Sequence, residues 1–217
     1  MHLQKIFNLN QFWQRIISGS IFLIVFWSIF FISPIIFSIL MFSILLEILI
    51  FEWKNLFKPS DKKFWLLMPI YPILPFSLII RINLIPACRR FLLIIFILVF
   101  CFDSGSYIAG KLFGKNKIAP KISPGKTWEG FIGGFFSVLF GTNLIFLFLK
   151  LPLFDLDLLI LFSFSISLFA FLGDLFESYL KRRAGIKDTG NLMPGHGGLL
   201  DRFDSILFAV FFLFFIL

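Results

Sequence analysis

Residues 158–177 read LLILFSFSISLFAFLGDLFE, and this stretch decides the fold class. Up to residue 173 it is apolar apart from scattered serines and one glycine. A transmembrane helix needs about 20 mostly apolar residues to cross a hydrocarbon core of ~30 Å, and this stretch has that length. Its far end carries two carboxylates, Asp174 and Glu177, and ionisable groups at a membrane boundary are candidates for function. We therefore predict a membrane-spanning helix over 158–177 that leads directly into a polar, functional segment.

The composition extends this prediction to the whole chain. The protein has 217 residues, of which 59% are hydrophobic and 15% charged, and its mean hydropathy is +0.97. Soluble domains have about 25% charged residues. The apolar residues are spread along most of the sequence, which excludes a soluble domain with a single membrane anchor. Cys88 and Cys101 are too few for a disulfide framework. We expect one integral membrane domain over 1–217.

Applying the same length criterion elsewhere predicts an all-α, polytopic transmembrane bundle with about seven spans. Ser33 and Pro34 mark a tight turn, and three prolines at 69, 72 and 75 are expected to kink or break one helix. The final stretch covers only about 20 Å as a helix, which is short for a crossing. The predicted spans are 16–33, 34–51, 64–80, 91–108, 130–149 and 158–177, followed by the short stretch 205–217.

The distribution of Lys and Arg predicts the orientation, because basic residues are retained on the cytoplasmic side. With the N-terminus inside, most of the 20 Lys and Arg fall in cytoplasmic segments. The exceptions are Arg81, Arg89, Arg90 and Lys150. This asymmetry places two long polar loops, 103–129 and 178–204, on the same cytoplasmic side of a cell membrane, where they could build one site.

The loop 178–204 and the residues just before it combine carboxylates, cations and glycines. Carboxylates can hold Mg²⁺, which prefers hard oxygen ligands and also binds substrate phosphates. Lys and Arg can neutralise phosphates, and glycines allow a close approach of the backbone. A solvated loop that merely obeys the positive-inside rule would account for residues 181–183. It would not account for the carboxylates Asp201 and Asp204, or for His196 between glycines.

The loop 103–129 is basic and punctuated by glycines, with hydroxyl groups beside lysines, as a phosphate cradle would be. Gly125-Lys126-Thr127 is similar to the end of a P-loop, but Pro120 and Lys121 stand where the upstream glycine would be expected. No strand followed by a helix is expected there either, so we reject a Walker motif. Asp103 is either a solvated helix-end carboxylate or a site residue, and we favour the site.

The motif from Ser178 to Asp204 resembles the signature of the phosphatidate cytidylyltransferase family. It reads Ser-x-apolar-Lys-Arg, four residues, Lys-Asp, and then Pro-x-His-Gly-Gly-apolar-x-Asp-Arg-apolar-Asp. The run Ser-Pro-Gly-Lys-Thr-Trp-Glu-Gly at 123–130 is similar to a second block of that family. The resemblance covers roughly 103–204, about half of the chain. It implies an integral membrane enzyme that transfers CMP from CTP to phosphatidic acid, giving CDP-diacylglycerol and pyrophosphate in phospholipid biosynthesis.

Under this interpretation the substrates are CTP and phosphatidic acid of the inner leaflet, the cofactor is Mg²⁺, and no nucleic acid is bound. A homodimer is compatible with the sequence. Asp174 and Asp201 are the leading metal ligands. Asp188 and Asp204 are either further ligands or orient neighbouring cations, and Arg202 could equally pair with Asp204. The expected phosphate-binding or catalytic residues are Lys126, Lys181, Arg182, Lys187, His196 and Arg202, and the expected substrate contacts are Asp103, Lys111, Ser123 and Ser178.

Two other functions stay open at this point. A CTP-using kinase of a polyprenol or phytol would transfer the γ-phosphate to an alcohol and would need a base for that hydroxyl. A transporter of anionic lipids or nucleotides would place its charges near the middle of the bilayer, often within broken helices. In this sequence the charges gather in loops at one face.

The orientation predicted from the basic residues can be tested by labelling. Lys117→Cys and Lys187→Cys, introduced singly, should react with a membrane-impermeant maleimide only after the cytoplasmic side is opened. Labelling of the two cysteines from opposite sides would rule out a shared cytoplasmic site.

Overall fold

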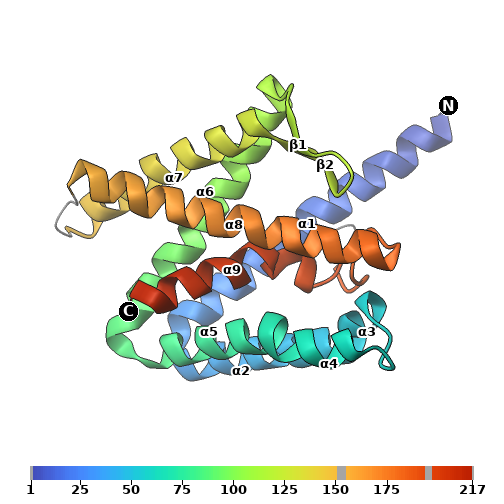
Figure 1. Cartoon of the computed structure of the whole chain (residues 1–217), viewed down its shortest axis with the longest axis horizontal. Helices are drawn as coiled ribbons and strands as arrows, with labels where there is room; N and C mark the ends of the chain where they lie inside the picture. Colours follow the sequence, from blue (N-terminus) through green and yellow to red (C-terminus); the bar gives the residue numbers. More distant parts are fainter. Residues whose placement is uncertain (1, 151–154, 194–196, 217) are drawn as a thin grey trace. The chain divides into compact units, whose positions relative to one another are not determined.

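A computed structural model describes residues 2–150, 155–193 and 197–216, without the side chains of residues 2–12, 14–16 and 216. The chain is almost entirely helical (Figure 1). Two short π-helices, η1 and η2, interrupt longer helical segments. The elements in chain order are α1 (His2–Ile32), α2 (Pro34–Glu47), η1 (Ile48–Glu52), α3 (Trp53–Leu56), α4 (Lys62–Met68), η2 (Pro69–Ile73), α5 (Leu74–Leu84), α6 (Pro86–Phe113), β1 (Lys117–Ala119), β2 (Ser123–Thr127), α7 (Trp128–Phe148), α8 (Leu156–Ala184) and α9 (Leu200–Ile216).

The helices confirm a polytopic membrane protein. Within the described residues, five helical segments are long and apolar enough to cross a bilayer. Each contains or closely matches a predicted span, so hydropathy located these helices correctly. The first predicted span corresponds to a shorter apolar segment, Ile17–Ile32, inside α1. The five segments are Pro34–Leu56, Lys62–Leu84, Pro86–Phe113, Trp128–Phe148 and Leu156–Ala184.

The turn and the proline-rich break also follow the predictions. Ser33 has an extended backbone (φ −157°, ψ 132°), and its hydroxyl accepts a hydrogen bond from the Ile36 amide at 3.5 Å, so it caps α2. In the segment Lys62–Leu84, Pro69 and Pro72 lie in η2, where the α-helical pattern changes to a π-helix. Proline lacks the amide proton that an α-helix needs, so a local change of helix type at this point is expected.

The chain divides into two compact units. Unit 1 comprises residues 1–84 and 183–203, and unit 2 comprises residues 85–182 and 204–217. In unit 1, α2 packs against α1 and α5. The ring of Phe203 lies 5.4 Å from that of Phe76 and 6.1 Å from that of Phe26, which anchors the first turn of α9 among apolar side chains. That the whole chain forms a single domain stays a prediction.

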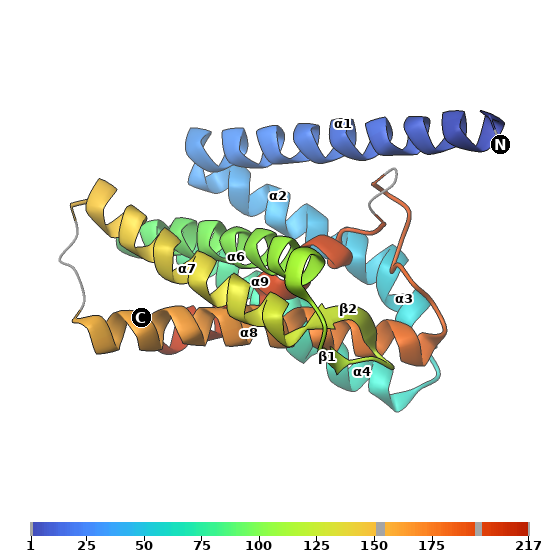
Figure 2. The same cartoon turned by 90° about the horizontal axis from the view of Figure 1, so that it is seen from above.

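Unit 2 is organised by the close packing of α6 against α7, which lie side by side in both views (Figures 1 and 2). Small residues make this approach possible. A Cβ atom added to Gly134 would lie 2.7 Å from the ring of Phe102, and one added to Gly133 would overlap the Cβ of Ala109. Glycines spaced along one face are typical of helix pairs in membranes, where van der Waals packing drives association.

The loop 103–129 differs from the prediction. Residues 103–113 continue α6, and β1 and β2 then form an antiparallel hairpin in which Lys117 pairs with Thr127 (Figure 2). The expectation that no strand precedes a helix here was wrong, because β2 leads directly into α7. The Thr127 hydroxyl caps α7 by accepting a hydrogen bond from the Gly130 amide at 3.1 Å. The hairpin is antiparallel and lacks the upstream glycine, so it is still not a P-loop.

The packing of α6 on α7 predicts that Gly133→Ala lowers stability. The new methyl group would overlap Ala109, a short side chain that cannot move aside. Overpacking of this kind costs about 1–3 kcal/mol, which outweighs the gain of ~1 kcal/mol in helix propensity. The thermal unfolding midpoint of the purified protein in detergent should therefore fall.

A matched control is Gly125→Ala in β2, where nothing lies within 4 Å of the added Cβ. This substitution should leave the midpoint nearly unchanged. An unchanged or higher midpoint for Gly133→Ala would contradict the close packing of α6 on α7.

Candidate functional site

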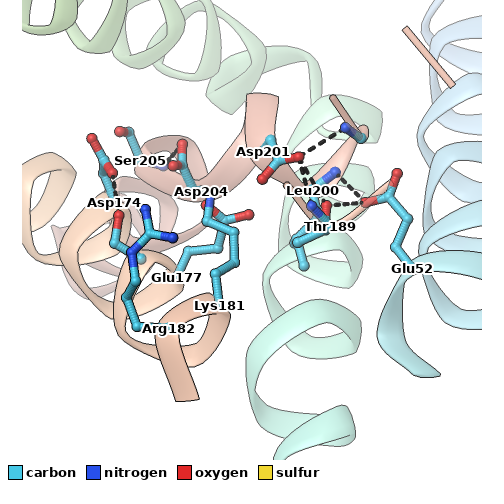
Figure 3. A network of polar contacts seen from close by, with 12 residues as sticks. Glu52, Asp174, Glu177, Lys181, Arg182, Thr189, Leu200, Asp201, Asp204 and Ser205 are labelled. Carbon is cyan, nitrogen blue, oxygen red and sulfur yellow. Dashed lines mark hydrogen bonds and ion pairs between the residues drawn. The ribbon is translucent and has the colours of Figure 1, made fainter. Parts of the chain in front are cut away.

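A buried glutamate organises the polar region of unit 1. Glu52, the last residue of η1, is 1% exposed. Its Oε1 accepts a hydrogen bond from the Leu199 amide at 2.6 Å. Its Oε2 accepts one from the Leu200 amide at 2.9 Å (Figure 3). The same Oε2 accepts a hydrogen bond from the Thr189 hydroxyl at 2.8 Å. The first amides of a helix have no intrahelical partner, so Glu52 satisfies donors at the start of α9.

Two glycines make room for this carboxylate. A Cβ added to Gly190 would lie 3.0 Å from Glu52 Oε1, and one added to Gly198 would overlap the same oxygen. Gly190 and Gly198 thus allow the backbone to approach a buried side chain. That glycines of this loop also admit a polyphosphate stays a prediction.

Asp201 holds the same loop through hydrogen bonds from two of its backbone amides. Its Oδ2 accepts hydrogen bonds from the Thr189 amide at 2.9 Å and from the Gly198 amide at 2.8 Å (Figure 3). Gly197 has a φ of +85°, and a Cβ there would lie 2.7 Å from this oxygen and 3.2 Å from the Cβ of Asp188. Asp188 therefore lies close to Asp201. That either residue binds a metal ion stays a prediction.

A second polar cluster lies in unit 2, where three predicted metal or substrate residues come together. Lys126 of β2 forms an ion pair with Asp174 of α8, and its ammonium lies 5.0 Å from the centre of the Phe171 ring. The Ser205 hydroxyl is 3.4 Å from Asp103 Oδ1, and the Ser205 amide donates to Asp204 Oδ1 at 2.7 Å. We call Asp103, Lys126, Asp174 and Asp204 the carboxylate cluster.

The carboxylate cluster has more negative than positive charge. Desolvation raises the pKa of Asp204 to about 7, and repulsion from Asp174 adds to this effect. The Ser205 amide and the charge of Lys126 lower that pKa, but by less than desolvation and Asp174 raise it. A site with three carboxylates and one lysine therefore has an unmet demand for positive charge, which a cation could supply.

The cations after Asp174 already have partners in unit 2. The ammonium of Lys181 lies 2.6 Å from Glu177 Oε2, and the Glu177 side chain is fully buried. The Nε of Arg182 donates to the Ile122 carbonyl at 3.1 Å, which ties α8 to the hairpin. Ser178 donates to Asp174 Oδ1 at 3.2 Å. These contacts hold the end of α8 in place, and whether Lys181 and Arg182 also bind phosphate stays a prediction.

The remaining predicted residues are dispersed. Lys111 of α6 is exposed, with its ammonium 5.7 Å from the centre of the Tyr107 ring. Ser123 begins β2. In unit 1, Lys187 and Arg202 are exposed. His196 lies outside the described residues.

Sequence reasoning missed Glu52 and Thr189, which together hold the loop in unit 1. The predicted span ends at residue 51, one residue before Glu52. The available signal was a carboxylate at the end of an otherwise apolar stretch, since such groups rarely occur there without a partner. Its partners are 137–148 residues away in the sequence, and no local pattern could identify them.

Among the residues that the structure describes, no three His, Cys, Asp or Glu side chains are arranged as a preformed metal site. Magnesium is often held by only one or two carboxylates together with substrate phosphates and water. The carboxylate cluster fits that second type of site. Its chemistry suits the binding of a metal–phosphate complex, with Lys126 available as a point charge for a phosphate oxygen.

Comparisons with known proteins agree with this chemistry. The family model described as the cytidylyltransferase family matches residues 63–217. Three similar proteins are each named phosphatidate cytidylyltransferase. That of Haemophilus influenzae is 41% identical over 183 residues, covering 73% of this chain and 62% of its own. That of Bacillus subtilis is 41% identical (76% and 61%), and that of Staphylococcus aureus is 39% identical (72% and 59%).

The chain spans about three fifths of the length of these curated relatives. The match to the family model includes α6, the hairpin, α7, α8 and α9, and with them every residue of the carboxylate cluster. Glu52 lies before the matched region. From the extent of these matches, the chain belongs to the cytidylyltransferase family.

Proposed function

We propose that this protein is a phosphatidate cytidylyltransferase, which transfers CMP from CTP to phosphatidic acid and releases pyrophosphate. The observation that carries the proposal is the carboxylate cluster, in which an ion pair between Lys126 and Asp174 lies beside two further carboxylates. Transfer of a nucleotidyl group requires the positioning of several anions and the neutralisation of their charge, more than it requires acid–base chemistry.

The reaction itself demands little proton transfer. An oxygen of the lipid phosphate is already anionic at neutral pH and attacks the α-phosphorus of CTP. A new P–O bond forms, the bond from the α-phosphorus to the oxygen bridging to the β-phosphate breaks, and pyrophosphate leaves with that electron pair. The kinase alternative differs in this respect, because its alcohol nucleophile would have to lose a proton to a base.

Asp174 and Asp204 are the residues that would hold Mg²⁺ in this proposal, with Asp103 as a neighbouring negative charge. A bound Mg²⁺ would neutralise charge on the triphosphate and on the leaving pyrophosphate. Lys126 would bind a phosphate oxygen and orient it against the cluster, while Ser178 would hold Asp174 through its hydrogen bond. Asp201 and Asp188 stay candidates for a second metal contact in unit 1.

Phosphatidic acid keeps its acyl chains in the bilayer, so its phosphate can be offered only at headgroup depth. Asp103 and Asp174 lie within α6 and α8, toward the ends that the basic residues assign to the cytoplasm. We therefore place the reaction at the cytoplasmic face of the cell membrane, with the lipid arriving from the inner leaflet and CTP from water. This mechanism needs only one chain, and a homodimer stays a prediction.

The proposed function predicts the fate of a labelled phosphate. The purified protein in detergent, given phosphatidic acid, Mg²⁺ and each of the four nucleoside triphosphates in turn, should transfer an α-phosphate label to lipid only from CTP. Transfer of a γ-phosphate label to a polyprenol or phytol would support the kinase alternative. No transfer to any lipid, with transport of the anion into vesicles, would support the transporter.

A second prediction concerns Asp174→Asn, which is nearly isosteric. It removes the charge that pairs with Lys126 and would help to bind the metal, so turnover should fall by roughly 100-fold or more, the scale of losing a main electrostatic group. The thermal unfolding midpoint should change little.

The matched control is Asp157→Asn, the same substitution at an exposed position in the first turn of the same helix, and it should keep its turnover. If Asp174→Asn retained most of its activity at ordinary Mg²⁺ concentrations, the metal assignment would have to be withdrawn.

A further inference from the structure

We propose that Glu52 is a positioning residue for catalysis, because its carboxylate fixes both ends of the loop 187–200 that follows α8. The expected effect on turnover rests on the proposed function. The role of Glu52 in holding the loop rests on the geometry of unit 1. Glu52 lies outside the region that matches the family model. The contacts that Glu52 makes in unit 1 are therefore the basis for assigning it this role.

The contacts of Glu52 join segments that are far apart in the loop. Thr189 lies near the start of the loop, and Leu199 and Leu200 lie at its end. Both carboxylate oxygens accept hydrogen bonds. The Leu199 amide donates to Oε1, and the Leu200 amide and the Thr189 hydroxyl donate to Oε2 (Figure 3). Hydrogen bonds to a charged acceptor are about twice as strong as neutral ones, so this carboxylate is an effective clamp.

Other contacts also hold the loop against the segment that carries Glu52. The side-chain amide of Asn55, three residues after Glu52, donates to the Thr189 carbonyl at 2.8 Å. Gly190 and Gly198 lie against the Glu52 side chain and leave no space for a Cβ. The π-helix η1 ends at Glu52, and π-helical turns often occur at functional positions, where the extra residue redirects a side chain.

The loop held in this way carries Lys187, which is expected to bind phosphate, and leads to carboxylates that are expected to bind metal. Lys187 and Asp188 directly precede Thr189, and Asp201 follows Leu200 and binds the Thr189 amide. If the two ends of the loop separated, these side chains would lose their fixed positions. Glu52 need not touch a substrate for this, so its effect should fall on turnover more than on the Michaelis constant for CTP.

The substitution that tests the proposal is Glu52→Gln. A glutamine has the same shape, but its NH₂ group would have to face one of the two backbone amides, which are donors themselves. A nitroxide on Leu192→Cys, an exposed position in the loop, reports the order of the loop in the full-length protein in detergent. Cys88 and Cys101 are replaced by Ala in all variants.

The matched control is Glu47→Gln, five residues earlier on the same helical segment. Glu47 carries the same type of carboxylate close enough to Glu52 to interact with it electrostatically, and a glutamine there removes the charge but keeps the shape. We expect Glu52→Gln to sharpen the nitroxide spectrum and to lower kcat at least tenfold with less than a threefold change in KM for CTP. Glu47→Gln should leave the spectrum of the loop as it is in the parent protein.

Thr189→Val provides a second test in case Glu52→Gln folds poorly. It removes the hydroxyl that donates to Glu52 and keeps the glutamate, so it should loosen the loop partially. Its effect on the spectrum should not add to that of Glu52→Gln, because both substitutions break the same contact.

The outcomes separate this proposal from the proposed function. An unchanged spectrum in Glu52→Gln, or equal loosening by Glu47→Gln, would overturn the positioning role. So would a loss of turnover in Glu52→Gln without any change in loop order. If the parent protein transfers no cytidylyl group, the proposed function fails, and the spectra still decide whether Glu52 holds the loop.

Discussion

A carboxylate that is removed from water among apolar helices must be matched by hydrogen-bond donors or by positive charge. This constraint governs both polar regions of the protein, and they satisfy it differently. In unit 1, Glu52 and Asp201 are matched by backbone amides and a hydroxyl, and these bonds hold a loop. In unit 2, Asp204 and its neighbours share one lysine, and their charge is only partly matched. The first arrangement is suited to structure and the second to binding a cation with its substrate.

The apolar helices followed from the sequence because membrane spans depend on composition over about 20 residues, which local reading captures. Asp174 and Lys126 were likewise predicted as site residues from the charge pattern and the family resemblance, and the structure pairs them. The role of Glu52 could not be predicted, because its hydrogen-bond partners follow only from the three-dimensional fold. The hairpin of β1 and β2 was missed for a related reason, since its strands are short and rich in glycine, proline and lysine.

Glycine has different structural roles at different positions of this protein. In α6 and α7, glycines bring two helices together. At Gly197 a positive φ requires the residue, while Gly198 has no such backbone demand and is glycine because a carboxylate occupies the space. Sequence patterns alone do not distinguish these three roles, because each is recognised only from the backbone conformation or the neighbouring atoms in the folded protein.

The contact between Gly198 and Glu52 also constrains how this sequence can change by descent. A Cβ at position 198 would overlap the Glu52 carboxylate and come within 2.5 Å of the Thr189 hydroxyl. Alanine at 198 would need room at both residue 52 and residue 189, and a shorter residue at 52 gives up bonds to the start of α9. Each single step is thus harmful, and positions 52, 189 and 198, of which the first is far from the other two along the chain, are expected to change together during evolution.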